Sequence, residues 1–301
     1  MIKSIKIVNY LNEELILTLK NPEQSGFYVI NVDGLGPCKA DINMTEMATN
    51  DGAEFNSARV NSRNIVLSLI FSEIPSVEYY RQLTYKYFPL KKKLKIIVET
   101  DNRLCEAYGY VESNEPTIFS QREGTQISII CPDSNLYSSQ IKTTVLSGVE
   151  SAFEFPFSNE SLTEKLIEFS RLIKTNQENV KYDGDIDVGV VINIDAVGTA
   201  KNINIYNVTA RQSMKILDDK MVSVMGGSIK ANDRITISTV KGNKYITLLR
   251  DGAETNILNC LDKKPNWFTI SKGDNIFAFD ADEGYENLYF SITNKIAYEG
   301  I

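Results

Sequence analysis

The chain has 301 residues, of which 43% are hydrophobic and 24% charged, and its formal net charge is −7. At roughly 100–200 residues per domain, this length predicts about two domains of ordinary globular composition. The negative charge argues against duplex nucleic acid as the main partner, because phosphate binding needs clustered Lys and Arg. Histidine is absent, which excludes triads and zinc sites that use its imidazole but leaves carboxylate and lysine chemistry open.

Neither a signal peptide nor a membrane span is expected. The longest apolar run, Ile65–Phe71, is far shorter than a bilayer-spanning segment. We therefore expect a protein that is made in a cytoplasm and does not insert into a membrane. The four cysteines are scattered along the chain, which predicts reduced and mostly buried thiols instead of a disulfide framework. They are Cys38, Cys105, Cys131 and Cys260.

Short β-branched and aromatic runs, separated by Gly, Asn, Asp and Pro, predict strands along most of the chain. In the first half these are Phe27–Val32, Arg63–Phe71, Leu94–Thr100, Cys105–Ser113 and Thr125–Cys131. In the second half they are Asp187–Ala196, Ile203–Val208, Arg234–Val240, Lys244–Arg250, Trp267–Ile270, Asn275–Asp280 and Asn287–Ile292. Strict alternation places five apolar residues on one buried face of a sheet. They are Ile186, Val188, Val190, Ile192 and Ile194.

One helix is predicted over Ser76–Phe88, where apolar residues recur at helical spacing and Pro89 ends the pattern. The segment Leu162–Lys174 is ambiguous. Ser161 and Glu164 form a capping-box pattern typical of a helix start, but the residues before them, Phe153–Phe157, indicate extended chain.

A polar, Ser-rich passage follows the strand that ends at Cys131. It predicts a domain boundary within residues 137–160. We therefore divide the chain into a first domain of residues 1–140 and a second domain of residues 141–301.

The tract Asp41–Arg59 is long for a connection within a compact domain, and its polar sequence is interrupted by Met44, Met47 and Phe55. Two interpretations remain open, a segment that reaches toward a neighbouring subunit or a mobile surface loop. Four tyrosines lie in or beside the predicted helix and either cover the end of the sheet or form a contact surface. They are Tyr79, Tyr80, Tyr85 and Tyr87.

No catalytic, cofactor-binding or metal-binding residue is predicted. Gly34 and Gly36 lack the third glycine of a dinucleotide loop and precede Pro37, which indicates a turn. The carboxylates of Asp183, Asp185 and Asp187 mimic the start of a calcium loop, but Val188 and Ile194 stand where that loop needs Gly and Glu. A second acidic loop contains Asp280, Asp282 and Glu283, and we interpret it as a charged turn. A glycosidase would need a pair of carboxyl groups, for which Glu112 and Glu115 are candidates. Both lie at the end of a predicted strand, and no other residue pattern of an active site surrounds them.

Several segments together carry a resemblance to a known family. In the first half they are Asp33–Ala40, Asp51–Ala53, Val60–Ile65, Tyr80–Pro89, Gly109–Pro116, Phe119–Ser120 and Gln126–Asp133. Looser matches follow in the same order at Asp183–Gly189, Asn202–Asn207, Asp233–Ile237, Asn256–Leu258, Asn266–Phe268 and Lys272–Asn275. In this order and spacing the chain resembles the distal tail proteins of bacteriophages that infect Gram-positive hosts.

The resemblance implies a mainly all-β fold. The first domain is expected to be a β-barrel or sandwich with one helix and a projecting hairpin, and the second a galectin-like β-sandwich. It also favours an extended conformation for Glu164–Ile173. The galectin sugar site uses a histidine and a stacking tryptophan. This chain has no histidine, and its one tryptophan, Trp267, is expected to pack in the core.

The function implied by the resemblance is structural and not enzymatic. Copies would form a six-fold ring at the distal tail or baseplate of a phage, or of a phage-tail-like bacteriocin, and join the tail tube to the baseplate hub or tail tip. The expected partners are further copies of the chain, the tube protein, the hub or tail-tip protein and peripheral baseplate or receptor-binding proteins, without a cofactor. The alternative is a carbohydrate-binding module that adheres to the host cell wall.

Overall fold

The computed structural model describes residues 1–47, 51–151, 170–174, 177–263 and 265–301. These residues form two compact units, one of Met1–Gln140 with Ala297–Ile301 and one of Ile141–Ile296. The division into 1–140 and 141–301 made from the sequence differs from this one at the C-terminus, because Ala297–Ile301 belongs to the first unit. Strands dominate both units, which confirms the all-β fold class. Neither α-helix of the described residues has the length and apolar character that a bilayer span requires.

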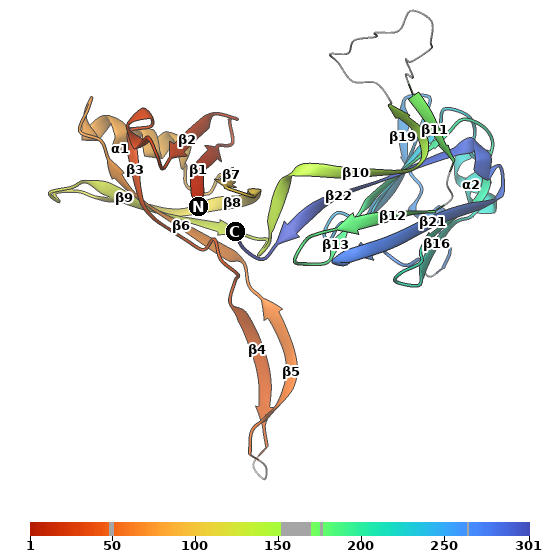
Figure 1. Cartoon of the computed structure of the whole chain (residues 1–301), viewed down its shortest axis with the longest axis horizontal. Helices are drawn as coiled ribbons and strands as arrows, with labels where there is room; N and C mark the ends of the chain where they lie inside the picture. Colours follow the sequence, from red (N-terminus) through yellow and green to blue (C-terminus); the bar gives the residue numbers. More distant parts are fainter. Residues whose placement is uncertain (48–50, 152–169, 175–176, 264) are drawn as a thin grey trace, which may run out of the picture. The chain divides into compact units, whose positions relative to one another are not determined.

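The first unit is built on an antiparallel sheet with the strand order β3-β6-β9-β8-β7-β1-β2 (Figure 1). The strands are β1 Ile2–Val8, β2 Glu14–Thr18, β3 Phe27–Asp33, β6 Arg63–Phe71, β7 Lys93–Thr100, β8 Leu104–Thr117 and β9 Gly124–Cys131. Side chains from these strands share one core, and they alternate clearly in β6, where Ile65, Leu67 and Leu69 are buried and the residues between them are not. The beginning of β10 (Leu136–Ser151) adds to β8 through Tyr137.

The predicted helix is confirmed as α1, Val77–Tyr87. It begins where the Ser76 hydroxyl accepts a hydrogen bond from the Tyr79 backbone N–H at 3.2 Å, the usual role of serine at this position. The Tyr80 ring packs edge-on against Phe27, with 5.4 Å between the ring centroids. Figure 1 shows the helix lying across the sheet, so its buried residues complete the core of the first unit.

A separate two-stranded hairpin, β4 (Ala40–Glu46) with β5 (Ala53–Val60), projects from the first unit (Figure 1). It takes up almost all of the tract Asp41–Arg59. The projecting hairpin implied by the family resemblance is therefore present.

The second unit is an antiparallel β-sandwich. One sheet has the order β19-β18-β17-β14-β22-β10, with β11 on β10, and the other has the order β12-β21-β15-β16. The first sheet contains β11 Ser170–Lys174, β14 Val191–Ala196, β17 Arg234–Ser238, β18 Tyr245–Arg250, β19 Ala253–Asn256 and β22 Leu288–Tyr298. The second contains β12 Gln177–Tyr182, β15 Lys201–Asn207, β16 Gln212–Ile216 and β21 Gly273–Glu283. The two layers meet where Phe279 of β21 stacks on Phe290 of β22, with ring centroids 3.7 Å apart.

The strand expected at Asp187–Ala196 is split in two. Its start, β13 (Val188–Gly189), pairs with β20 (Thr269–Ile270), and the remainder is β14. At the break, the Val190 backbone N–H donates to the side-chain oxygen Thr239 Oγ1 at 2.8 Å. Val190 is therefore not paired with a neighbouring strand, and β13 and β14 are separate strands. Val190, Ile192 and Ile194 are buried as predicted, whereas Ile186 and Val188 are only half-buried.

Two further segments bear on the predictions, one helix that was not predicted and one ambiguous segment that the structure describes only in part. The helix α2, Asp218–Met225, was not predicted. In the ambiguous segment Leu162–Lys174, the residues Ser170–Lys174 form a strand, as the resemblance favoured. The rest of that segment, together with Phe153–Phe157, lies outside the described residues.

Candidate functional site

The hairpin β4–β5 has one apolar face. Its cross-strand partners are Ala40 with Val60, Ile42 with Ala58 and Met44 with Phe55. Partners share a face and successive side chains alternate, so these residues lie on the same side of the ribbon. A β-bulge at Asn56 adds one residue to β5 and keeps Phe55 on the side of Ala58.

Nothing in the described residues covers this apolar face. The exposed fractions are 57% for Ile42, 55% for Met44, 62% for Phe55 and 53% for Val60. A two-stranded hairpin is marginally stable in water unless its apolar face packs on another surface. Contiguous exposed apolar side chains on a folded protein mark an interaction site. The hairpin is therefore the strongest candidate site of the chain.

The opposite face of the hairpin is polar and internally bonded. Arg59 Nε lies 3.7 Å from Asp41 Oδ2, and the Asn56 amide donates to Thr45 Oγ1 at 2.6 Å. Toward the tip the charge becomes acidic, because residues 42–58 contain acidic side chains but no Lys or Arg. These acidic residues are Glu46, Asp51 and Glu54. The hairpin thus combines an apolar face with a negatively charged end.

The root of the hairpin is fixed by Arg63, whose side chain is 1% exposed. Its guanidinium donates to the main-chain oxygens of Ser134, Gly34, Gly36 and Glu299 at 2.5–2.9 Å. Arginine suits this position because its planar fork offers five donors. The side chain joins the segment before β4, the start of β6 and the last residues of the chain.

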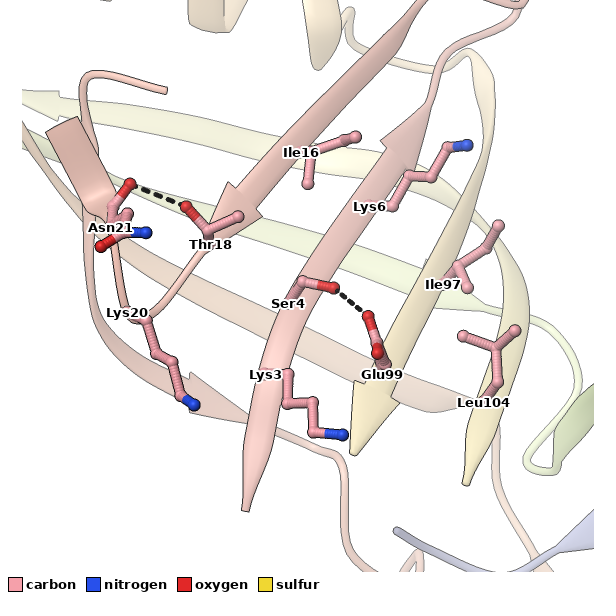
Figure 2. A pocket seen from close by; sticks show the side chains of 10 residues that line it. All are labelled: Lys3, Ser4, Lys6, Ile16, Thr18, Lys20, Asn21, Ile97, Glu99 and Leu104. Atoms are coloured by element: carbon pink, nitrogen blue, oxygen red, sulfur yellow. Dashed lines mark hydrogen bonds between the residues drawn. The ribbon is translucent and has the colours of Figure 1, made fainter. Parts of the chain in front are cut away.

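A second, unlike surface lies on the outer face of β2, β1, β7 and β8 (Figure 2). We call it the basic groove; its volume is about 460 Å³. The lining residues are Lys3, Ser4, Lys6, Ile16, Thr18, Lys20, Asn21, Ile97, Glu99 and Leu104.

Strand register explains the composition of the basic groove. Lys6 of β1 lies between Ile16 of β2 and Ile97 of β7, and Ser4 lies between Thr18 and Glu99. Since these residues share the outward face, apolar side chains form the floor at one end. Figure 2 shows Lys3 and Lys20 at the other end of β1. The lining contains three lysines and one glutamate, so its local charge is positive although the chain as a whole is acidic.

The acidic loops named in the sequence carry surface ion pairs. Lys272 lies 3.9 Å from Asp185, and Lys201 lies 2.8 Å from Glu283. No cluster of three or more metal-binding side chains occurs among the described residues. Glu112 and Glu115 are exposed on β8, where Glu112 accepts a hydrogen bond from Ser128 Oγ at 2.8 Å.

The tyrosines at the helix were expected either to cover the end of the sheet or to form a contact surface, and the structure shows examples of both a buried and an exposed position. Tyr80 is buried against Phe27 and covers the core, whereas Tyr79 and Tyr85 are each 49% exposed. In the second unit Trp267 packs partly buried against the core, as expected, with Lys244 over its ring at 5.4 Å.

All four cysteines are free thiols, and three of them are buried. Burial raises the pKa of Cys105, Cys131 and Cys260, that of Cys131 to about 11. A thiol with a raised pKa carries little thiolate at neutral pH and is unreactive. These cysteines therefore act as packing groups.

No protein-family model and no curated protein sequence matches the chain. Among solved structures, it is similar to the Dit protein of phage SPP1, described as a paradigm of the hub adsorption apparatus in phages that infect Gram-positive bacteria. That match has a TM-score of 0.66 and 11% identity, and covers 98% of this chain and 100% of the other. A chain of the phage P2 baseplate in its activated conformation with calcium gives a TM-score of 0.48 at 10% identity, with 98% of each chain covered. The SPP1 match shows that the chain has the fold of a phage distal tail protein, as the sequence resemblance predicted.

Proposed function

We propose that the chain is a structural adaptor in the tail of a phage or phage-like particle. Copies of it close a ring that joins the distal end of the tail tube to the baseplate hub or tail tip. The fold of the SPP1 hub protein supports a place in this part of the tail. In this proposal the chain acts by assembly and has no catalytic turnover.

The observation that carries the proposal is the uncovered apolar face of the hairpin. A ring needs two unlike surfaces on each subunit, so that every copy binds the next in the same way. The hairpin provides a projecting surface, and the remainder of the first unit provides surfaces that can receive it. Burying Ile42, Met44 and Phe55 in such a contact would remove exposed apolar area from water, which is the main driving force of association.

The copy number of six comes from the family resemblance. The remaining partners follow from the same proposal, with the tube protein on one side of the ring and the hub or tail-tip protein on the other. Assembly takes place in the cytoplasm of the bacterial host.

The proposal is tested by the oligomeric state of hairpin variants in native mass spectrometry. The wild type is expected to form a closed oligomer, and Met44→Ser with Phe55→Ser is expected to be monomeric, with the melting temperature of wild-type protein diluted until it is monomeric. The matched control is Asn43→Ser with Ser57→Ala, which alters the polar face beside the same positions and keeps the oligomer. A wild type that stays monomeric at high concentration and with tail tubes added would refute the proposal.

A further inference from the structure

We propose that the basic groove of one copy receives the hairpin β4–β5 of the next copy, with the acidic tip at the Lys3 and Lys20 end. This inference rests on the head-to-tail ring proposed above and names the two surfaces that meet in it. It assigns a docking function to the groove and chooses a second copy of this chain as the occupant.

The apolar parts of the two surfaces match. In the groove Ile16 is 47% exposed and Leu104 is 41% exposed, and Ile97 lies on the same outward face. On the hairpin, Met44 and Phe55 are cross-strand partners, and both are exposed large apolar side chains. No residue that the structure describes covers either set. Placing one on the other buries both, as expected of the centre of a specific interface.

The charges of the two surfaces are opposite and follow the same order. Along the hairpin, Met44 and Phe55 are followed toward the tip by Glu46, on the same face as Met44, and then by Asp51. Along the groove, the floor around Ile16 and Ile97 is followed by Lys3 and Lys20 (Figure 2). Glu99 and Leu104, which are cross-strand partners, lie at this second end as well. Aligning apolar with apolar therefore brings carboxylates to ammonium groups. Such charge complementarity fixes the register of a contact and excludes the reverse orientation.

The lysines remain able to bind a partner. Lys3 Nζ lies 3.9 Å from Asp101 Oδ1, a long and exposed contact that a second carboxylate could replace. Lys6 is held by Glu14 at 2.6 Å, so its ammonium group is already paired. We therefore assign recognition of the acidic tip to Lys3 and Lys20, whereas the stem of Lys6 forms part of the floor.

A charge-swap series tests the inference by sedimentation velocity. Lys3→Glu with Lys20→Glu is expected to weaken association at least about tenfold, as is Glu46→Lys with Asp51→Lys. Mixing the two double variants, or combining all four changes in one chain, is expected to restore association. The control, Lys241→Glu with Lys263→Glu, makes the same change of charge on exposed residues of the second unit and leaves association intact.

Cross-linking supplies a second readout that does not depend on charge. In a Cys38→Ser background, Ile16→Cys with Met44→Cys is expected to give disulfide-linked multimers under mild oxidation. Ile16→Cys with Asn43→Cys, which points from the other face of the hairpin, is not. If the hairpin variant Met44→Ser with Phe55→Ser dissociates the oligomer but the groove variants neither weaken it nor cross-link, this inference is wrong and the ring stands. If the wild type never associates, the ring proposal fails as well.

Discussion

Arg63 donates a hydrogen bond from Nη2 to the main-chain oxygen of Glu299 at 2.6 Å, although the two residues are 236 positions apart. The guanidinium is buried, and among the described residues its partners are main-chain oxygens and not a carboxylate. One charged side chain thus joins the root of the hairpin to the end of the chain. The last residues belong to the first unit for the same reason, and the Ile301 backbone N–H also donates to Leu35 O at 3.1 Å.

Replacing Arg63 by Lys is expected to destabilise the first unit by about 2–4 kcal/mol. A single ammonium group cannot reach all four carbonyl oxygens, and each buried acceptor left without a donor costs about 1–3 kcal/mol. Urea unfolding measures the change. Arg122→Lys, on an exposed loop, is the control and should change the stability by less than about 0.5 kcal/mol. Equal stabilities of the two variants would show that the Arg63 network is not needed.

Gly34→Ala is expected to destabilise the first unit by about 2 kcal/mol or more. Gly34 has φ +83°, and a Cβ at this position would lie 1.9 Å from the main-chain oxygen of Asn64. Gly36→Ala is the matched control two residues away, where an added Cβ has no neighbour within 4 Å. Thermal melts of both variants check the difference. A Gly34→Ala melt that coincides with the wild type would contradict this description of the hairpin root.

Asp233→Asn is expected to destabilise the second unit by about 3–5 kcal/mol. Arg250 binds Asp233 in a bidentate pair at 2.5 and 2.9 Å, and the Asp233 side chain is 1% exposed. Removing the carboxylate charge leaves a partly buried guanidinium without its partner. Asp195→Asn is the control because its pair with Arg234 is exposed and should contribute about 0–1 kcal/mol. The prediction fails if both variants show the same small loss in chemical denaturation.

The stability of the first unit is expected to fall between about pH 9 and pH 11, in part through Cys131. Burial raises the pKa of this thiol from 9.0 to about 11. The unfolded chain therefore loses the proton first as the pH rises, which favours unfolding by up to about 2–3 kcal/mol. Urea unfolding of the wild type and Cys131→Ala at about pH 8 and about pH 10.5 isolates this contribution. The variant should lose less stability than the wild type over that interval; identical losses would count against it.

The elements that local chemistry specifies could be predicted from the sequence. Ser76 and Pro89 mark the two ends of α1, and the alternation along Arg63–Phe71 reproduces β6 residue for residue. In the hairpin, the alternation of Ala40, Ile42 and Met44 was already visible, but the tract was interpreted as a long polar segment that either reaches toward a neighbouring subunit or forms a mobile surface loop. Alternating apolar residues usually indicate a strand that packs on a core, whereas the apolar face of this hairpin is exposed.

Other features depend on contacts between residues far apart in the chain, which sequence periodicity does not reveal. Leu217, which precedes α2, has no side chain that can cap the helix, and the Asp218 backbone N–H donates instead to Asn202 Oδ1 at 2.9 Å. Two acidic residues in the first turn and Gly226 in a left-handed conformation at the end were usable signals. The break at Val190 arises from Thr239, a residue 49 positions away. The basic groove was not predicted because its lysines come from separate strands and meet only through the register of β1 with its neighbours. The return of Ala297–Ile301 to the first unit likewise depends on Arg63.

The central claim is that copies of this chain close a ring through the hairpin, and it is tested most directly by cryo-electron microscopy of the particle that contains the chain. We expect a closed ring beneath the end of the tail tube, with the β4–β5 hairpin of each copy seated on the first unit of its neighbour. Density for the chain as single copies, at another place in the particle, or in a ring whose hairpins remain exposed to solvent would contradict the claim.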